Sequence, residues 1–241
     1  GATVREYTVP NYLHHDTQKL PWGNYLVPGN LYPITATNNG LSEEDTLVEI
    51  DADSGAVVRT WDFNTILDSN RTPIPSSNRD DDWLHLNSAI YEPADNSILI
   101  TAQRQSLAAK IDYTTGELIW ILGSHEGWTA AHQDKLLTPV DSEGNPVDVS
   151  AEYFWPYGPH AILSFGDGSV ALFDNGAQRG WYGDLAPAEL AEQDFSRGVE
   201  YVIDEDNMTV QIVWQFDADK QIYTSITGDI DYLPNDHYVL A

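Results

Sequence analysis

The sequence predicts an all-β protein made of repeated antiparallel units. Between Leu84 and Leu122 lie four short apolar runs rich in β-branched residues, separated by turns that contain Pro, Asp, Asn and Gly. The strands expected from these runs cover residues 84–91, 97–102, 107–112 and 117–122. A four-stranded meander of this size is the unit from which the blades of a β-propeller are built.

A repeat along the chain is the second observation that predicts a propeller. An Ile-Asp pair, a turn and a Trp recur at Ile50 to Trp61, Ile111 to Trp120 and Ile203 to Trp214. A histidine also lies near the start of the first strand in three successive units, and residues 228–241 form a fourth copy without a histidine at the matching place. We therefore expect residues 1–241 to form a single β-propeller domain that covers about four to five blades and is incomplete at one or both ends.

The segments between these units predict further elements. We expect an outer strand of a preceding blade over 3–10, a short helical link over 62–68 and a short helix over 186–193. Long polar loops cover 35–45, 70–82 and 123–157. Loops of this length are often functional, so we expect them to form the rim of a pocket.

The charge balance excludes some classes of partner. The 241 residues include 38 acidic and 11 basic ones, for a net charge of −27. Nucleic acids and anionic membranes bind Lys and Arg, so neither is an expected partner. The balance resembles that of proteins from salt-adapted organisms. There is no Cys and no run of 18 apolar residues, so no disulfide, thiolate metal site or membrane insertion is expected. Association into oligomers is left open.

Histidine and arginine are the scarce residues that suggest chemistry. His15, His85 and His160 hold the same place in three units, so we expect them to converge at one end of the central channel. Three arginines, Arg104, Arg179 and Arg197, are also scarce residues in a chain this acidic. Arg pairs with sulfate or phosphate oxygens and His can act as a nucleophile or a general acid and base, which together suit an anionic substrate.

Other interpretations of the same residues stay open. Each His could be a hydrogen-bonded structural residue at the top of its unit. Three His could also hold Zn²⁺, although they lack the short spacing of zinc motifs, and we expect no metal. The segment Asp51 to Gly55 is better interpreted as a hairpin turn than as a calcium loop, and Arg79 to Asp82 as a solvated loop.

Several blocks of sequence resemble the bacterial arylsulfate sulfotransferases. These blocks occur in the family's order between His15 and Ala241, and they cover residues 82–88, 120–128, 172–180, 196–201 and 223–227. The resemblance implies a six-bladed β-propeller. It also implies sulfuryl transfer from an aryl sulfate to a phenol through a sulfohistidine, without a nucleotide sulfate donor or any other cofactor, and a periplasmic or extracellular location.

The resemblance implies roles for individual residues. His160 matches the nucleophile, and His85 and His15 match residues that stabilise charge or shuttle the phenolic proton. The other matched or neighbouring residues that it places at the substrate are His14, Asn87, Gln103, Arg104, Arg179 and Arg197.

One position departs from the family pattern. The family has an Arg where this chain has Gln103, and Arg104 follows it. Neighbouring side chains on a strand point to opposite faces, so Arg104 would need a bulge to reach the sulfate, or the enzyme would be weak. The alternative function is a non-catalytic propeller of the same ancestry that binds a ligand or a protein, or has a structural role.

Overall fold

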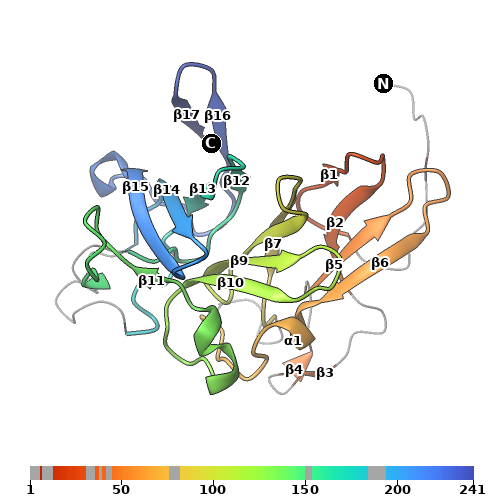
Figure 1. The fold of residues 1–241 in the computed structure, drawn as a ribbon, viewed down its shortest axis with the longest axis horizontal. Coiled ribbons are helices and arrows are strands. Elements are labelled where there is room, and N and C mark those ends of the chain that lie inside the picture. The colour runs from red at the N-terminus through yellow and green to blue at the C-terminus, as the bar shows by residue number, and fades with distance from the viewer. Residues whose placement is uncertain are drawn as a thin grey trace.

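Antiparallel sheets make up the computed structural model, which confirms the all-β prediction. It describes residues 6, 13–30, 36–37, 40–41, 45–75, 82–149, 154–183 and 194–241. Three large sheets follow one another along the chain and lie side by side, with a two-stranded hairpin at the C-terminal end (Figure 1). The strand expected over 3–10 and the helix expected over 186–193 lie outside the described residues.

The first large sheet has the strand order β1-β2-β5-β6. Its strands are β1 (Gln18–Lys19), β2 (Tyr25–Gly29), β5 (Thr46–Ile50) and β6 (Val57–Asp62). The expected helical link is α1 (Phe63–Ile66), which begins where the Asp62 side chain accepts a hydrogen bond from the Asn64 amide. A small separate hairpin of β3 (Ala36–Thr37) and β4 (Gly40–Leu41) comes between β2 and β5 in the chain. The sequence did not predict it.

The second sheet is the predicted meander. Its strands are β7 (Leu86–Glu92), β8 (Ser97–Ala102), β9 (Leu107–Asp112) and β10 (Leu118–Gly123), in the order β10-β9-β8-β7. The aspartate of the Ile-Asp repeat caps a turn: Asp112 Oδ1 accepts hydrogen bonds from the amides of Thr114 and Thr115 at 2.8 and 2.6 Å. Asp51 and Asp204 do the same in the other two copies, so the repeat is a turn motif.

The third sheet has the order β11-β15-β14-β13-β12. Its strands are β11 (Thr138–Pro139), β12 (Ile162–Ser164), β13 (Ser169–Asp174), β14 (Arg197–Asp204) and β15 (Thr209–Phe216). The excursion over 123–157 contains the 3₁₀ helix η1 (Ala130–Lys135) and then β11, which pairs in parallel with β15. After η2 (Ala218–Lys220), the expected fourth copy forms the hairpin of β16 (Ile230–Leu233) and β17 (His237–Leu240).

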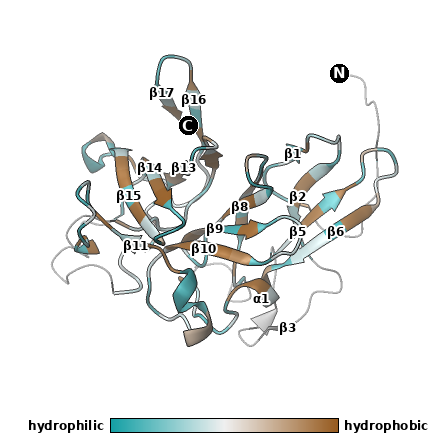
Figure 2. Ribbon diagram, in the orientation of Figure 1, coloured by the Kyte–Doolittle hydropathy of each residue, from teal (hydrophilic) through white to brown (hydrophobic). Residues whose placement is uncertain are grey.

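The apolar core lies on both faces of the middle sheet. Ile98 and Ile100 of β8 belong to the cluster shared with the first sheet, and Leu99 between them belongs to the cluster shared with the third. This is the alternation of a strand with two buried faces, which explains why β8 is almost continuously apolar. Figure 2 shows the same pattern as brown ribbon along much of β9, β10, β14 and β15.

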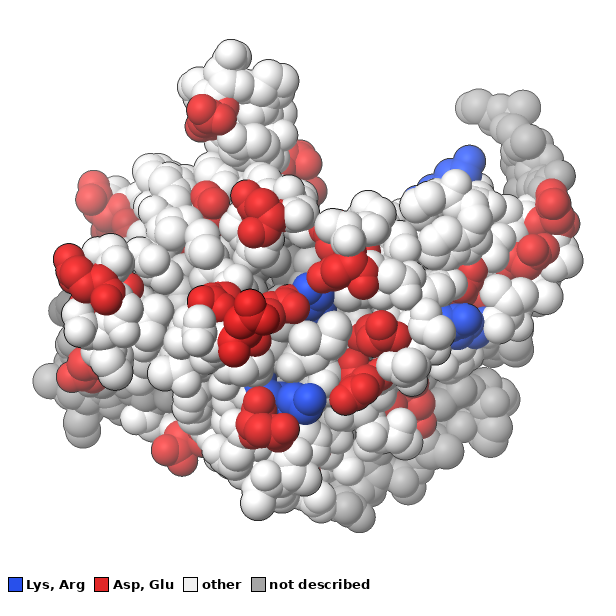
Figure 3. All heavy atoms as spheres, viewed as in Figure 1, with Lys and Arg blue, Asp and Glu red and all other residues white. Residues whose placement is uncertain are grey.

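Contacts between strands of neighbouring sheets bring three distant chain segments together. β7 contacts both β2 and β12, and β12 also contacts β16. The residues just before these strands therefore meet at one end of the molecule. Acidic side chains are spread over the face seen in Figure 3, and the few basic ones lie among them. No helix among the described residues is long and apolar enough to cross a membrane.

Candidate active site

The three histidines singled out by the repeat lie together. The ring centroid of His15 is 5.2 Å from that of His85 and 6.3 Å from that of His160. The ring of His14 packs edge-on against His15 at 4.8 Å. An open pocket of about 480 Å³ adjoins the cluster, and its walls include His15, His160 and Asn87. The structure thus brings together five of the residues that the resemblance assigned to the site, and they are His14, His15, His85, Asn87 and His160.

Unusual backbone conformations direct these side chains. His15 and His85 have positive φ angles of 57° and 55°. A residue with a side chain rarely adopts this region, at a cost of about 1–3 kcal/mol, and such strain clusters at functional sites. Gly158 takes the positive φ, 62°, on the approach to His160, and the His160 amide then donates to the Phe173 carbonyl at 2.9 Å.

Both nitrogens of His160 have partners that define its protonation. Its Nε2 accepts a hydrogen bond from the Thr227 amide at 3.1 Å, so this nitrogen carries no proton. Its Nδ1 lies 2.7 Å from Asn175 Oδ1 and must be the donor. The pKa of His160 is lowered to about 4, mainly by burial; the bond to Asn175 opposes this shift, and the rings of His15 and His85 add to it. His160 is therefore a neutral imidazole at neutral pH with an unprotonated Nε2.

Asn175 also fixes the segment that covers His160. Its Nδ2 donates to the carbonyls of Thr224 and Thr227 at 2.9 and 2.7 Å, and the side chain is fully buried. After Thr227 the chain passes directly over Phe173 at Gly228. A Cβ on Gly228 would lie 2.3 Å from Phe173 Cε1, so only glycine permits this approach.

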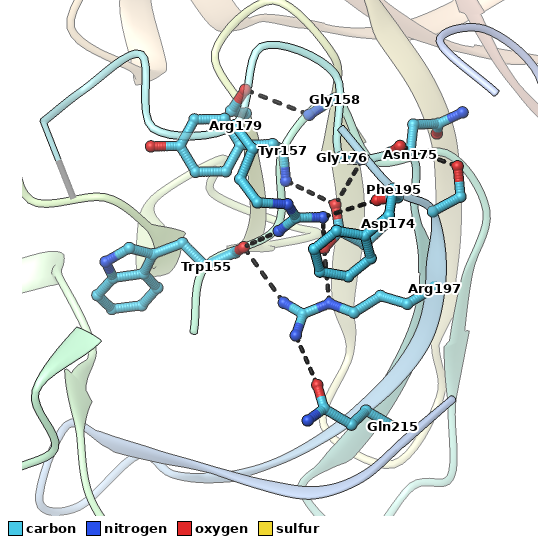
Figure 4. A network of polar contacts seen from close by, with 12 residues as sticks. Trp155, Tyr157, Gly158, Asp174, Asn175, Gly176, Arg179, Phe195, Arg197 and Gln215 are labelled. Carbon is cyan, nitrogen blue, oxygen red and sulfur yellow. Dashed lines mark hydrogen bonds and ion pairs between the residues drawn. The ribbon is translucent and has the colours of Figure 1, made fainter. Parts of the chain in front are cut away.

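A buried charge network lies beside Asn175, the partner of His160 Nδ1 (Figure 4). Asp174 Oδ2 accepts from Arg179 Nη2 at 2.9 Å and from Arg197 Nε at 2.8 Å, and both arginines are 1% exposed. Further bonds run from the two guanidinium groups to the Trp155 carbonyl. These contacts give both arginines a structural task next to Asn175. Their predicted direct contact with substrate stays a prediction.

His85 has a carboxylate partner. Its Nδ1 lies 2.6 Å from Asp82 Oδ2, and because a carboxylate only accepts, Nδ1 carries a proton. The Asp82 side chain is 3% exposed, which corrects the solvated-loop interpretation for this residue; residues 79–81 lie outside the described part. Nearby, Asp45 accepts from the Leu84 amide, and burial followed by the charge of Asp82 raises the pKa of Asp45 well above its usual range.

Asn87 reaches the pocket through a bulge in β7. Leu86 pairs with Ala102 and Ser88 pairs with Thr101, so Asn87 is the extra residue between them. Its Nδ2 donates to the Pro159 carbonyl at 2.9 Å, and its buried Oδ1 has no hydrogen-bond partner within the described structure. This oxygen can accept a hydrogen bond from a ligand such as a phenolic hydroxyl.

Gln103 and Arg104 lie in the turn that follows β8, and their side chains have different partners. Gln103 Nε2 donates to the Ser225 carbonyl at 3.1 Å, on the segment that covers His160. Arg104 is 4% exposed, and its Nε donates to the Asp82 carbonyl at 3.0 Å, behind His85. Because Ala102 is the last residue of β8, the strand alternation and the bulge expected at Arg104 do not apply to this turn.

Sequence reasoning missed three contributors to the site: Asp82, Asn175 and the amide of Thr227. Each lies within a block that resembles the family, which was the available signal. Among the described residues, no three His, Asp or Glu side chains are arranged to hold a metal ion.

Comparison with known proteins defines the family. The chain belongs to the arylsulfotransferase (ASST) family, whose model matches residues 1–241. It is 30% identical to the arylsulfate sulfotransferase AssT of Lelliottia amnigena, over 78% of this chain. It is 29% identical to the AssT of Escherichia coli O6:H1 strain CFT073 over the same share. The aligned region spans 37% of each of these relatives.

Solved structures give only a distant likeness. The periplasmic gluconolactonase PpgL of Pseudomonas aeruginosa superposes with a TM-score of 0.44 and 11% identity, over 93% of this chain and 49% of that one. A similarity at this level does not bear on the fold or the function of this chain.

Proposed function

We propose that this chain supplies the nucleophilic half of a sulfuryl-transfer site, in a six-bladed β-propeller of which it forms part. The proposed reaction moves a sulfuryl group from an aryl sulfate to a phenol through a sulfohistidine at His160. The observation that carries the proposal is the neutral His160, whose Nδ1–H is held by Asn175 while its unprotonated Nε2 is directed at the segment carrying Thr227.

In the first half of the reaction, His160 Nε2 attacks the sulfur of the aryl sulfate. The N–S bond forms while the S–O bond to the aryl group breaks, and the phenolic oxygen leaves with its electron pair. The Thr227 amide, which donates to Nε2 at 3.1 Å in the resting site, can then donate to a sulfuryl oxygen instead. Exchange of one acceptor for another keeps this buried donor satisfied.

In the second half, a phenol attacks the sulfur of the sulfohistidine. The new S–O bond forms, the N–S bond breaks, and His160 returns to its neutral state. A proton must reach the leaving phenolic oxygen in the first half and leave the attacking phenol in the second. The ring of His15 lies near both His85 and His160. His85 is the proposed proton carrier. Asn87 Oδ1 is placed to accept from the phenolic hydroxyl.

The test uses the full-length protein with a chromogenic aryl sulfate, with and without a phenol acceptor. We expect release of the chromophore that depends on the acceptor and is lost in His160→Ala. Acid quenching without acceptor, followed by peptide mass spectrometry, should place one added SO₃ group on His160. The matched control is His132→Ala, a histidine that packs on Trp128 outside the pocket. Equal transfer activity of wild type and His160→Ala would reject the mechanism. If neither protein released the chromophore, the result would favour a binding protein.

A further inference from the structure

The environment of His85 differs from that of His160, because the Nδ1 of His85 faces a buried carboxylate. Asp82 Oδ2 lies 2.6 Å from His85 Nδ1, and the Asp82 side chain is 3% exposed. The described residues that line the pocket include no Lys or Arg. Among the described residues around this pocket, a histidine is the side chain that can carry positive charge beside a sulfuryl group.

We infer that Asp82 is a positioning residue that acts through His85. Its carboxylate fixes the proton on Nδ1 and stabilises the imidazolium form, which leaves Nε2–H available to the leaving phenolic oxygen. The inference rests on the proposed sulfuryl transfer and extends it to a residue that does not touch the substrate. In the second half of the reaction, His85 Nε2 takes the proton from the acceptor phenol, so the ring returns to its starting state and no net proton is consumed.

The groups around Asp82 and His85 support this role. Arg104 Nε donates to the Asp82 carbonyl at 3.0 Å, which holds the backbone of Asp82 in place. Asp45 accepts a hydrogen bond from the Leu84 amide, and burial, followed by the charge of Asp82, raises the pKa of Asp45 well above its usual range. On the pocket side the ring of His15 packs edge-on against His85. The Asp82 carboxylate thus faces His85 Nδ1 from within the protein.

The alternative is that Asp82 is only a structural anchor of the β7 entry, where His85 has a φ of 55°. An anchor would influence folding and the placement of His85 equally for all substrates. A positioning residue that controls a proton has a different signature: its loss matters most for donors whose phenoxide is a poor leaving group and needs that proton.

The test compares Asp82→Asn with wild type in the full-length protein, using phenyl sulfate and 4-nitrophenyl sulfate as donors and one phenol as acceptor. We expect kcat for phenyl sulfate to fall by about 10²–10⁴-fold, the usual contribution of general acid catalysis. For 4-nitrophenyl sulfate, whose phenoxide leaves unprotonated, we expect less than about a tenfold loss. KM should change little for both, and Asp82→Glu should restore part of the rate for phenyl sulfate.

Two controls separate the outcomes. Asp45→Asn replaces a neighbouring buried carboxyl that accepts from the Leu84 amide, and it should leave the rate with either donor within a few-fold of wild type. In a His85→Gln background, Asp82→Asn should add no further loss, because the carboxylate then has no ring to act through. Equal losses for the two donors, or additive losses in the double variant, would overturn the inference.

A measurement on the unmodified protein does not depend on the folding of any variant or on activity. Imidazole ¹⁵N shifts should show His85 protonated at Nδ1 near neutral pH, and His160 neutral with a bare Nε2. A His85 ring with a bare Nδ1 would overturn the inference even if sulfuryl transfer is confirmed. Conversely, the predicted ring states without any transfer would reject the proposed function and leave the Asp82–His85 pairing intact.

Discussion

His85 and His160 hold corresponding places, because each lies just before an edge strand of its sheet, β7 or β12. Their Nδ1 atoms nevertheless have different partners. His85 Nδ1 faces the carboxylate of Asp82 at 2.6 Å, and His160 Nδ1 faces the amide oxygen of Asn175 at 2.7 Å. The two geometries are nearly the same, and the difference is one of charge. A carboxylate favours the imidazolium ring beside it, whereas an amide oxygen orients the ring without stabilising a positive charge to the same degree.

This difference suits the two rings to different tasks. A nucleophile needs a free lone pair, so a neutral ring with its proton fixed on the far nitrogen is the useful form. A proton carrier must gain and lose a proton, and a neighbouring carboxylate makes the charged form accessible. The repeat therefore places two histidines at equivalent positions. Their partners differ in that Asp82 has a carboxylate and Asn175 has an amide, and this difference suits the two rings to different chemistry.

Exchange of the partner at His160 is the strongest way to break this comparison. Asn175→Asp would place a carboxylate against His160 Nδ1 and favour the protonated ring, which has no lone pair for attack. It would also set a carboxylate oxygen against the carbonyls of Thr224 and Thr227, which now accept from Nδ2. We expect kcat for transfer to fall by on the order of 10²–10³-fold, with a cost in stability of about 1–3 kcal/mol.

The kinetic loss in Asn175→Asp should shrink as the pH rises, because deprotonation restores the neutral ring. The activity ratio to wild type, measured from pH 6 to pH 9 with 4-nitrophenyl sulfate, checks this expectation. Asn175→Ser provides the matched control, since it removes the same hydrogen bonds without adding a charge. A loss that is independent of pH and equal in the two variants would show that Asn175 only holds the segment over His160.

The strands were predictable because their signals are local. The apolar runs over 97–102 and 107–112 became β8 and β9 with the same bounds, and the Ile-Asp repeat marked turns that the aspartate itself caps. Pairing across the sheet was less accessible. β11 covers only Thr138–Pro139 and pairs in parallel with β15, about 70 residues further along the chain, a contact that no local pattern announces.

The site was predictable in its histidines but not in their partners. Repeat position brought His15, His85 and His160 together, since equivalent positions of adjacent units face the same end of the molecule. The partners are specific to each unit. Asp82 stands in an acidic stretch that looks solvated, and its burial follows only from the way Arg104 and Leu84 pack around it. Asn175 looks like a turn residue, and its bonds to residues 224–227 depend on a segment from a later unit.

The low pKa of His160 gives the second prediction. Its value of about 4, against an ordinary 6.5, means that the folded protein resists protonation of this ring. Activity that depends on neutral His160 should therefore persist below pH 6 and fall only as the pH approaches 4. Between pH 6.5 and 4 the unfolded chain binds the proton more readily, so this group reduces stability as the pH falls and has no effect above 6.5.

Stopped-time assays of kcat/KM with 4-nitrophenyl sulfate, for which leaving-group protonation matters least, isolate this limb of the profile. Thermal unfolding over the same range, in wild type and His160→Gln, measures the linked stability, and the acid-side slope should be smaller in the variant. An acid limb centred near 6.5 in the wild type would mean that the burial of His160 does not perturb it in solution.

The smallest effects are expected at Gln103 and Arg104, which lie on the His160 and His85 sides of the site respectively. Arg104→Ala removes the bond to the Asp82 carbonyl and should cost about 1.5–3 kcal/mol of stability, seen as a lower Tm, with kcat within about tenfold at a temperature where the variant is folded.

Gln103→Arg places a cation beside Ser225, next to the covered face of His160. Because charge-assisted hydrogen bonds are about twice as strong as neutral ones, we expect KM for the aryl sulfate to fall by a few-fold with little change in kcat. Gln103→Met, which keeps the length and removes the polar group, separates the added charge from the lost bond to Ser225. Abolished transfer in folded Arg104→Ala, together with an unchanged KM in Gln103→Arg, would instead show that Arg104 reaches the sulfate during turnover.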